Sequence, residues 1–265
     1  MIYPFPVNEK EFLGKRVLVT GGTKGQGAAT VKRFALAGAT VITTARKRSD
    51  DLPAGVHFIE SDLTTIEGTN LVAQETLRLL NGIDIIIHVA GGSSSPAGGF
   101  ATQSEDEWQK ALDLNLFPAV RLDRILIPYM LKDKKGSIIH VSSIQRSLPL
   151  YESTLAYAAA KAALTNYSKG LSKEISPKGI RVNVVSPGWV STEASIAMME
   201  RISESKNITV EQATQSVMDA LGGIPIGRPT RPEEVSELIA FISSERAAAM
   251  TGHEYIIDGG TIPTI

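Results

Sequence analysis

Short apolar runs alternate with longer segments of mixed polarity along most of the 265-residue chain. Several of the short runs, such as Val17–Val19, are apolar without alternation, which is typical of strands buried on both faces of a parallel sheet. These runs predict strands over Arg16–Thr20, Thr40–Thr44, Val56–Glu60, Ile83–Val89, Gly136–Val141, Arg181–Ser186 and Tyr255–Asp258.

The longer segments carry apolar residues at helical spacing and predict helices between the strands. Two helix starts have the pattern of a capping box, Ser104 with Glu107 and Thr230 with Glu233. Strict alternation of strand and helix predicts an α/β fold, namely a single Rossmann-type doubly wound parallel sheet of about seven strands with helices on both faces. The predicted helices span Gln26–Ala37, Thr65–Leu80, Ser104–Leu131, Thr154–Ser176 and Arg231–Phe241.

No linker, low-complexity tract or repeat interrupts this order, so residues 1–265 are expected to form one domain. Residues 191–228 depart from the pattern, because they insert two short helical segments between the sixth and seventh strands. The insertion is expected to form a small helical lid over a substrate site. A surface decoration is the alternative.

Composition excludes several classes of function. Lys and Arg number 27 against 28 Asp and Glu, a net charge of −1, whereas domains that bind nucleic acid are usually basic. The absence of cysteine excludes a disulfide scaffold, a thiolate zinc site and a cysteine nucleophile. The four histidines are scattered with no pair at metal-ligand spacing, so no metal is expected.

Neither secretion nor membrane insertion is predicted. Glu9 and Glu11 lie where a signal peptide has its apolar core. The uncharged stretch Ile85–Ser104 is interrupted by glycine, serine and proline, well short of the roughly 20 apolar residues that a membrane span needs. A cytoplasmic protein is therefore expected.

A glycine-rich loop, Thr20–Gly27, separates the first predicted strand from the first helix. Glycine lets the backbone turn tightly and approach a pyrophosphate, while the following helix N terminus offers unpaired N–H groups. Because the loop opens the first βαβ unit, it predicts a dinucleotide site. No Gly-Lys-Ser/Thr ends the loop, which excludes a nucleoside-triphosphate loop.

Basic residues at the adenosine end favour NADP(H). An acid at the end of the second strand would bind both ribose hydroxyls, but the chain has none there before Asp50. Arg46 follows that strand and Lys24 lies in the glycine loop, so both are expected to reach a 2′-phosphate. A solvated basic turn is the alternative.

Tyr157 and Lys161 form a candidate acid–base pair. Their i, i+4 spacing on a predicted helix places the phenol and the ammonium on one face. A neighbouring cation stabilises a phenolate, so Lys161 is expected to lower the Tyr157 pKa toward neutrality. Of the six tyrosines, only Tyr157 has a lysine four residues on. Surface packing on an alanine-rich helix is the alternative.

Six motifs in the right order make the chain resemble the short-chain dehydrogenase/reductase family over residues 13–260. They are the glycine pattern at Thr20, Gly21, Gly25 and Gly27, the pair Asp62-Leu63, Asn115, Ser143 upstream of the Tyr-x-x-x-Lys pair, that pair itself at Tyr157 and Lys161, and Pro187-Gly188 with Trp189, Val190, Ser191 and Thr192.

The resemblance implies hydride exchange between a nicotinamide and a carbonyl or secondary alcohol. Tyr157 would exchange the proton, Ser143 would hydrogen-bond the reacting oxygen, and Lys161 would hold the nicotinamide ribose. Asn115 would anchor a water that passes protons to Lys161. The expected cofactor contacts are Gly21, Thr23, Lys24, Gly25, Gln26, Gly27, Arg46, Asp62, Leu63, Ala90, Gly91, Tyr157, Lys161, Pro187, Gly188, Val190 and Thr192.

Two departures from the family pattern are visible. The family usually has Asn-Asn-Ala-Gly after the fourth strand, where this chain has His88-Val89-Ala90-Gly91. The spacing from Ser143 to Tyr157 is one residue longer than is common, which indicates a loop insertion. Ser142 is the alternative to Ser143.

The substrate is expected to meet an apolar pocket with some polar contacts. If Arg146 points inward, a carboxylate or phosphate on the substrate would bind it. Ordinary packing is the alternative for Trp189 and the methionines. The residues expected around the reacting carbon are Gln145, Arg146, Leu150, Tyr151, Trp189, Met198 and Met199.

The sequence thus predicts an NADP(H)-dependent carbonyl reductase that acts on a small ketone, sugar or cyclic alcohol. One alternative is a 3-oxoacyl carrier-protein reductase, with Lys134, Lys135 and Lys173 as a docking patch for the acidic carrier. Another is a non-enzymatic NADP-binding sensor. The resemblance also implies a homo-oligomer, a tetramer or dimer, assembled through the two longest predicted helices.

Overall fold

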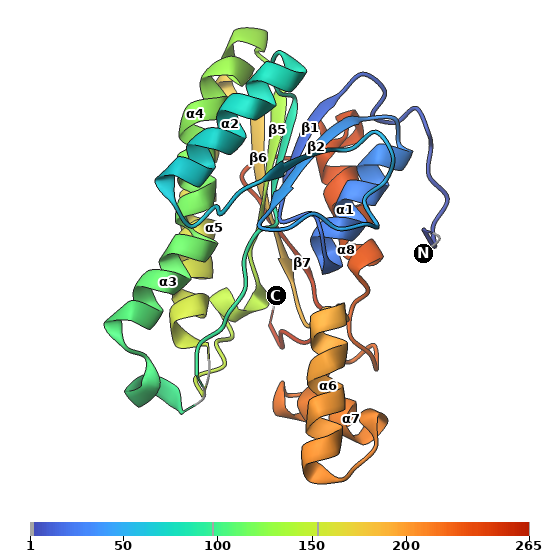
Figure 1. Ribbon diagram of the computed structural model, residues 1–265, viewed down its shortest axis with the longest axis vertical. Helices are drawn as coiled ribbons and strands as arrows, with labels where there is room; N and C mark the ends of the chain where they lie inside the picture. The colour runs from blue at the N-terminus through green and yellow to red at the C-terminus, as the bar shows by residue number, and fades with distance from the viewer. Residues whose placement is uncertain (1–2, 97, 153, 265) are drawn as a thin grey trace.

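Seven parallel strands form one sheet in the computed structural model, which describes residues 3–96, 98–152 and 154–264. The order across the sheet is β3-β2-β1-β4-β5-β6-β7 (Figure 1), so the predicted doubly wound α/β fold is confirmed. The strands are β1 (Arg16–Thr20), β2 (Thr40–Ala45), β3 (His57–Glu60), β4 (Ile85–His88), β5 (Gly136–Val141), β6 (Ile180–Pro187) and β7 (Glu254–Ile257).

Helices cover both faces of the sheet (Figure 1). On one face lie α1 (Gly25–Leu36) and α8 (Pro232–Ser243), which pack against each other. On the other face lie α2 (Ile66–Leu80), α4 (Phe117–Asp133) and α5 (Leu155–Ile175). This is the layering that right-handed crossovers produce on either side of the first strand.

Each face of the sheet has its own core, because successive residues of a strand point to opposite faces. Val17 and Val19 of β1 join the buried cluster that contains Phe34 of α1, whereas Leu18 joins the cluster that contains Leu122 of α4. Burying such a side chain contributes roughly 1.5–3 kcal/mol. Burial on both faces explains why this strand is apolar without alternation.

The single helix predicted over Ser104–Leu131 is wrong, since two helices occupy this segment. Between α3 (Glu105–Asn115) and α4, Leu116 leaves the helical conformation with φ −122° and ψ −59°. Pro118 in the first turn of α4 has no N–H and cannot bond the carbonyl of Leu114. The apolar spacing continues through the break, which is why the sequence pattern does not reveal it.

Of the two predicted capping boxes, the first is only half formed at α3. The Ser104 hydroxyl accepts the N–H of Glu107 at 3.3 Å, but the Glu107 carboxylate accepts from Lys110 at 2.8 Å. The box of Thr230 with Glu233 is wrong by one residue. The N–H of Arg231 donates to the Glu234 carboxylate at 2.8 Å, and α8 begins directly after Arg231.

Residues 191–228 contain α6 (Glu193–Lys206) and α7 (Val210–Ala220), a helix pair that projects beyond the sheet (Figure 1). The start of α6 lies against the glycine loop. The two segments are so close that a Cβ on Gly25 would come within 2.9 Å of Thr192 Cγ2. None of the described helices combines the length and apolarity that crossing a bilayer requires.

Candidate active site

A cleft of about 1000 Å³ opens at the carboxyl edge of the sheet, where β1 and β4 are neighbours. The chain leaves these two strands toward opposite faces, which creates the crevice where doubly wound sheets bind ligands. Every residue expected to contact the cofactor lines this cleft, from Gly21 in the glycine loop to Thr192 before α6.

The glycine loop has the tight backbone that its composition predicts. Gly21 and Gly25 adopt φ values of 69° and 50°, a region that disfavours any Cβ. A Cβ on Gly27 would lie 2.1 Å from the Gly21 carbonyl oxygen. The N-cap residue of α1, Lys24, provides no side-chain cap for the N–H groups at this helix end, which is the kind of end that binds anions.

Two buried polar atoms that belong to cleft-lining residues have no hydrogen-bond partner among the described residues, Gln26 Nε2 and Thr44 Oγ1. An unsatisfied buried polar atom costs about 1–3 kcal/mol. A ligand that carries many hydroxyl and phosphate oxygens removes that cost. The glycine cradle and these two atoms therefore fit a dinucleotide.

The far end of the cleft is basic. Lys24 and Arg46 are exposed and both line it, with Asp62 beside them. The backbone N–H of Thr64 lowers the pKa of Asp62, and the charge of Arg46 adds to this effect against the smaller opposing effect of burial. Asp62 is therefore an ionised hydrogen-bond acceptor at neutral pH.

At the opposite end, α5 presents Tyr157 and Lys161. Lys161 is 3% exposed, donates from Nζ to the carbonyl oxygen of Val141 at 2.9 Å, and lies 5.7 Å from the centre of the Tyr157 ring. Burial lowers the pKa of Lys161 to about 8, because the ammonium loses hydration. A Cβ on Gly91 would lie 2.9 Å from Lys161 Nζ, so the loop after β4 approaches this ammonium closely.

The Tyr157 pKa differs from the sequence-based expectation. Burial raises it, and a hydrogen bond with Ser143 opposes the shift only in part. Lys161 lies over the face of the ring and bonds Val141, so desolvation of the phenolate dominates. The phenol consequently keeps its proton at neutral pH.

The structure decides between the two candidate serines. The Ser142 hydroxyl donates to the carbonyl oxygen of Lys161 at 3.0 Å and bonds Thr165 Oγ1 at 2.8 Å, which ties β5 to α5. Ser143 also lines the cleft, its Oγ accepts the N–H of Gln145 at 3.2 Å, and it lowers the Tyr157 pKa against the larger effect of burial. Ser143 is therefore the serine that lies with the phenol.

Asn115 ends α3 and lies behind the loop that follows β4. Its Oδ1 accepts the N–H of Gly92 at 2.9 Å, while its Nδ2 donates at 2.9 Å to the carbonyl oxygens of Gly92 and Ala111. The side chain is 2% exposed. Its amide is thus committed to holding the loop that contacts Lys161.

Residues 21–261 match the family model described as enoyl-(acyl carrier protein) reductase. The 3-oxoacyl-[acyl-carrier-protein] reductase FabG of Thermotoga maritima is 31% identical over 260 residues, which cover 94% of this chain and 98% of that protein. The chain belongs to the short-chain dehydrogenase/reductase family. It is accordingly an oxidoreductase.

Solved structures of short-chain dehydrogenase/reductases superpose closely. L-sorbose reductase of Gluconobacter frateurii, complexed with NADPH and L-sorbose, gives a TM-score of 0.89 at 30% identity over 97% of this chain and 100% of its own. Aldohexose dehydrogenase of Thermoplasma acidophilum gives 0.85 at 26% identity over 98% of each chain.

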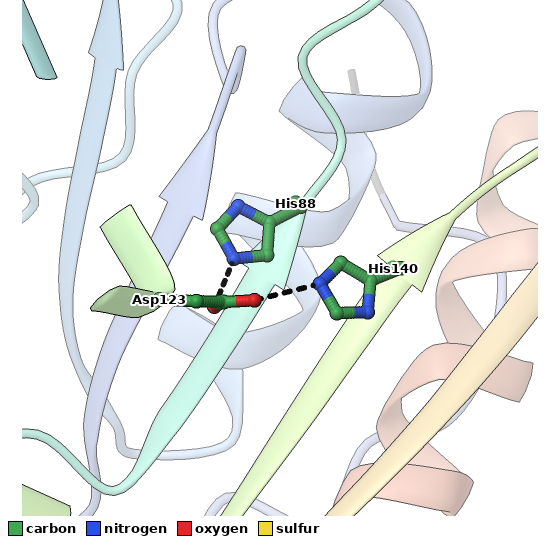
Figure 2. A group of neighbouring side chains, drawn as sticks. All are labelled: His88, Asp123 and His140. Atoms are coloured by element: carbon green, nitrogen blue, oxygen red, sulfur yellow. Dashed lines mark hydrogen bonds and ion pairs between the residues drawn. The ribbon is translucent and has the colours of Figure 1, made fainter. Parts of the chain in front are cut away.

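One departure from the usual short-chain dehydrogenase/reductase sequence creates a buried network behind the site (Figure 2). His88 stands where the family usually has asparagine, and β4 pairs with β5 so that His88 lies opposite His140. The two imidazoles stack with centroids 5.0 Å apart. Asp123 of α4 bonds His88 Nε2 at 2.8 Å and His140 Nε2 at 3.0 Å. Tyr167 of α5 donates to the same carboxylate at 3.1 Å.

Sequence spacing does not reveal this network. The four histidines are far apart in the sequence, but the fold brings His88 and His140 together. The sequence does contain one indication of the contact. His88 and His140 each lie near the end of a predicted strand, and these two strands are neighbours in the sheet. The ligating atoms of His88, Asp123 and His140 lie within 4.8 Å of one another. Hydrogen bonds from the imidazoles to an ionised carboxylate account for that closeness.

The substrate end of the cleft contains only part of the expected set. Gln145, Leu150, Trp189 and Met198 line it, whereas Met199 of α6 is buried at 2% exposure.

The other two expected substrate contacts are absent from the described lining of the cleft. Arg146 forms an ion pair with Glu254 of β7, and Tyr151 is 70% exposed. The expectation that both surround the reacting carbon stays a prediction that this lining does not support. A tertiary ion pair and a solvent-facing turn decide their positions.

Proposed function

We propose that this enzyme transfers hydride between NADP(H) and the carbonyl or alcohol carbon of a small molecule, with Tyr157 as general acid and base. The observation that carries the proposal is one cleft with two chemically different ends. Tyr157, Ser143 and Lys161 meet at one end, and Lys24 and Arg46 line the other. The NADPH complex of L-sorbose reductase supports the choice of cofactor.

In this proposal a bound nicotinamide supplies or accepts the hydride. During reduction, Tyr157 donates its proton to the substrate oxygen, and its raised pKa keeps that proton in place until negative charge develops there. Ser143 donates a hydrogen bond to the same oxygen. Lys161, whose pKa is about 8, stays charged at neutral pH and stabilises the charge left on Tyr157.

The basic end predicts a strong preference for the phosphorylated cofactor. We expect Lys24→Ala and Arg46→Ala each to weaken NADPH binding by roughly tenfold while NADH binding changes little, because each removes a charge-assisted contact to the 2′-phosphate. Titration of NADPH and NADH fluorescence measures both affinities. Lys47→Ala is the control, since Lys47 is exposed on the same turn outside the described cleft lining. Equal affinities of the unmodified protein for the two cofactors would remove the role of both residues.

We further propose that the substrate is uncharged. Among the lining residues of the segment after Ser143, Ile144, Leu148 and Leu150 are apolar. Gln145 is the polar one, and its Oε1 accepts the Thr154 hydroxyl at 2.5 Å. Arg146 is neutralised by Glu254 and is not available to a substrate anion.

A screen of NADPH oxidation over ketones, keto acids, quinones, sugars and oxoacyl thioesters tests this proposal. We expect neutral carbonyls to exceed keto acids in kcat/KM by roughly tenfold, the effect of one unfavourable charged contact. Arg146→Ala is expected to leave that ratio unchanged. Keto acids as the best substrates, with Arg146→Ala abolishing the advantage, would contradict an uncharged substrate.

A 3-oxoacyl carrier-protein reductase is the second candidate, because the FabG proteins are similar over nearly the whole chain. The expected lysine patch does not support it. Lys134 and Lys135 precede β5, and Lys173 lies roughly 24 Å along α5 from Tyr157. All three are at the amino edge of the sheet, opposite the cleft. A carrier would need another surface, and a steep loss of rate with added salt would reveal such docking.

A non-enzymatic NADP sensor is disfavoured by family membership and by the meeting of Ser143, Tyr157 and Lys161. We also propose that residues 1–265 act as one domain, with residues 191–228 as the substrate lid, because Met198 of α6 and Val217 of α7 line the cleft. A cytoplasmic homo-oligomer, tetramer or dimer, is proposed by analogy with the family, and sedimentation measures its size.

A further inference from the structure

The lid carries a carboxylate to the anion-binding end of α1. Glu193, the first residue of α6, accepts the N–H of Gly25 through Oε2 at 3.0 Å. Gly25 is the first residue of α1, so this N–H is one of those that a helix leaves unpaired at its N terminus. Glu193 lines the cleft, and its carboxylate stands where a phosphate would bind.

The neighbouring contacts direct Glu193 to this position. The Thr192 hydroxyl accepts the N–H of Ser195 at 3.3 Å, and the Ser195 hydroxyl accepts the N–H of Thr192 at 2.9 Å. These reciprocal bonds cap α6. The side chain that α6 offers to the glycine loop is therefore that of Glu193.

A carboxylate and a diphosphate cannot share this site. Both are anions, and both need the same N–H group and the positive end of the α1 dipole. Binding of a dinucleotide must displace Glu193 and move it away from the loop. Breaking the Glu193 contact costs free energy. Any ligand that places a diphosphate there therefore binds more weakly by that amount.

We propose that Glu193 is an internal competitor of the cofactor diphosphate and sets the dinucleotide affinity of the enzyme. The inference rests on the proposed use of a dinucleotide, but not on the preference for NADP(H). Because NADPH and NADH share the diphosphate, Glu193 weakens the binding of both by the same factor. Adenosine, which has no phosphate, is unaffected.

The test is equilibrium titration of NADPH, NADH and adenosine with the intact protein and its Glu193→Gln and Glu193→Ala variants. We expect each variant to bind both dinucleotides about fivefold more tightly, the factor that corresponds to a helix-end charge interaction of about 1 kcal/mol. Adenosine affinity should stay constant. Glu200→Gln is the matched control, since Glu200 is an exposed residue of the same helix outside the described cleft lining and loses the same charge.

Unchanged or weaker dinucleotide binding in both Glu193 variants would overturn the proposal, and so would an equal gain in Glu200→Gln. The proposal is measured as a ratio between variant and unmodified protein. The NADP(H) preference is measured as a ratio between two cofactors in the unmodified protein. The proposal about Glu193 and the proposed NADP(H) preference can therefore be disproved independently of each other.

Discussion

Replacement of Tyr157 by phenylalanine is expected to reduce turnover by roughly 10²–10⁴-fold while NADPH affinity changes by less than about threefold. The ring and its contact with Lys161 remain, but the proton that Tyr157 would transfer to the substrate oxygen is lost. Turnover is measured as NADPH oxidation with the best carbonyl of the screen, and affinity as quenching of NADPH fluorescence.

Tyr151→Phe is the matched control for this substitution. Tyr151 is 70% exposed and lies outside the described lining of the cleft, so its phenol should not affect turnover. A Tyr157→Phe variant with nearly full activity would show that another group supplies the proton. Loss of NADPH binding together with turnover would show instead that the phenol acts in cofactor binding.

The parts of the site that the sequence reveals are those in which chemistry and local geometry coincide. In the glycine loop, the tight turn and the free helix N terminus arise within eight consecutive residues, Thr20–Gly27. Tyr157 and Lys161 need only a helix to share a face. The topology rule for parallel sheets then brings both segments to one edge without any knowledge of side-chain contacts.

Contacts between segments that are far apart in the sequence cannot be predicted in this way. Arg146 meets Glu254 because β7 packs beside β6, and nothing near Arg146 in the sequence indicates this partner. In the sequence, Glu193 looks like an ordinary acidic residue in the first turn of a helix. Acidic residues are favoured there because they interact with the helix dipole. The second contact of Glu193, with Gly25, depends on where α6 packs relative to the glycine loop.

The break between α3 and α4 shows a different limit. Two prolines, Pro118 and Pro128, fall within the segment predicted as one helix. The helix ends just before the first and continues through the second, which lies inside α4. A proline therefore predicts a lost hydrogen bond but not whether the chain breaks there. Here Asn115 bonds the loop after β4, and this contact accompanies the break.

Asp123→Asn is expected to lower the free energy of unfolding by about 3–5 kcal/mol, the usual cost of removing one member of a buried charged network. Asp123 is 0% exposed and joins β4, β5 and α5 through His88, His140 and Tyr167. An asparagine nitrogen would face an imidazole N–H. Urea unfolding followed by circular dichroism measures the change. Asp113→Asn is the control, because its 3.6 Å ion pair with Arg121 is partly exposed and should contribute less than about 1 kcal/mol.

The pH dependence of stability distinguishes this network from ordinary packing. Burial lowers the pKa of His140 below its usual 6.5, so under acid the unfolded chain takes up a proton that the folded chain does not. Although burial alone raises the pKa of Asp123, its interactions with the imidazoles of His88 and His140 hold it well below 3.8. The free energy of unfolding should thus fall as pH drops below about 6.5, and fall further below about 4. Asp123→Asn should make the second decrease smaller, while other carboxyls with a lowered pKa, such as that of Asp62, still contribute to it. A second decrease of undiminished size would show that Asp123 does not contribute to it.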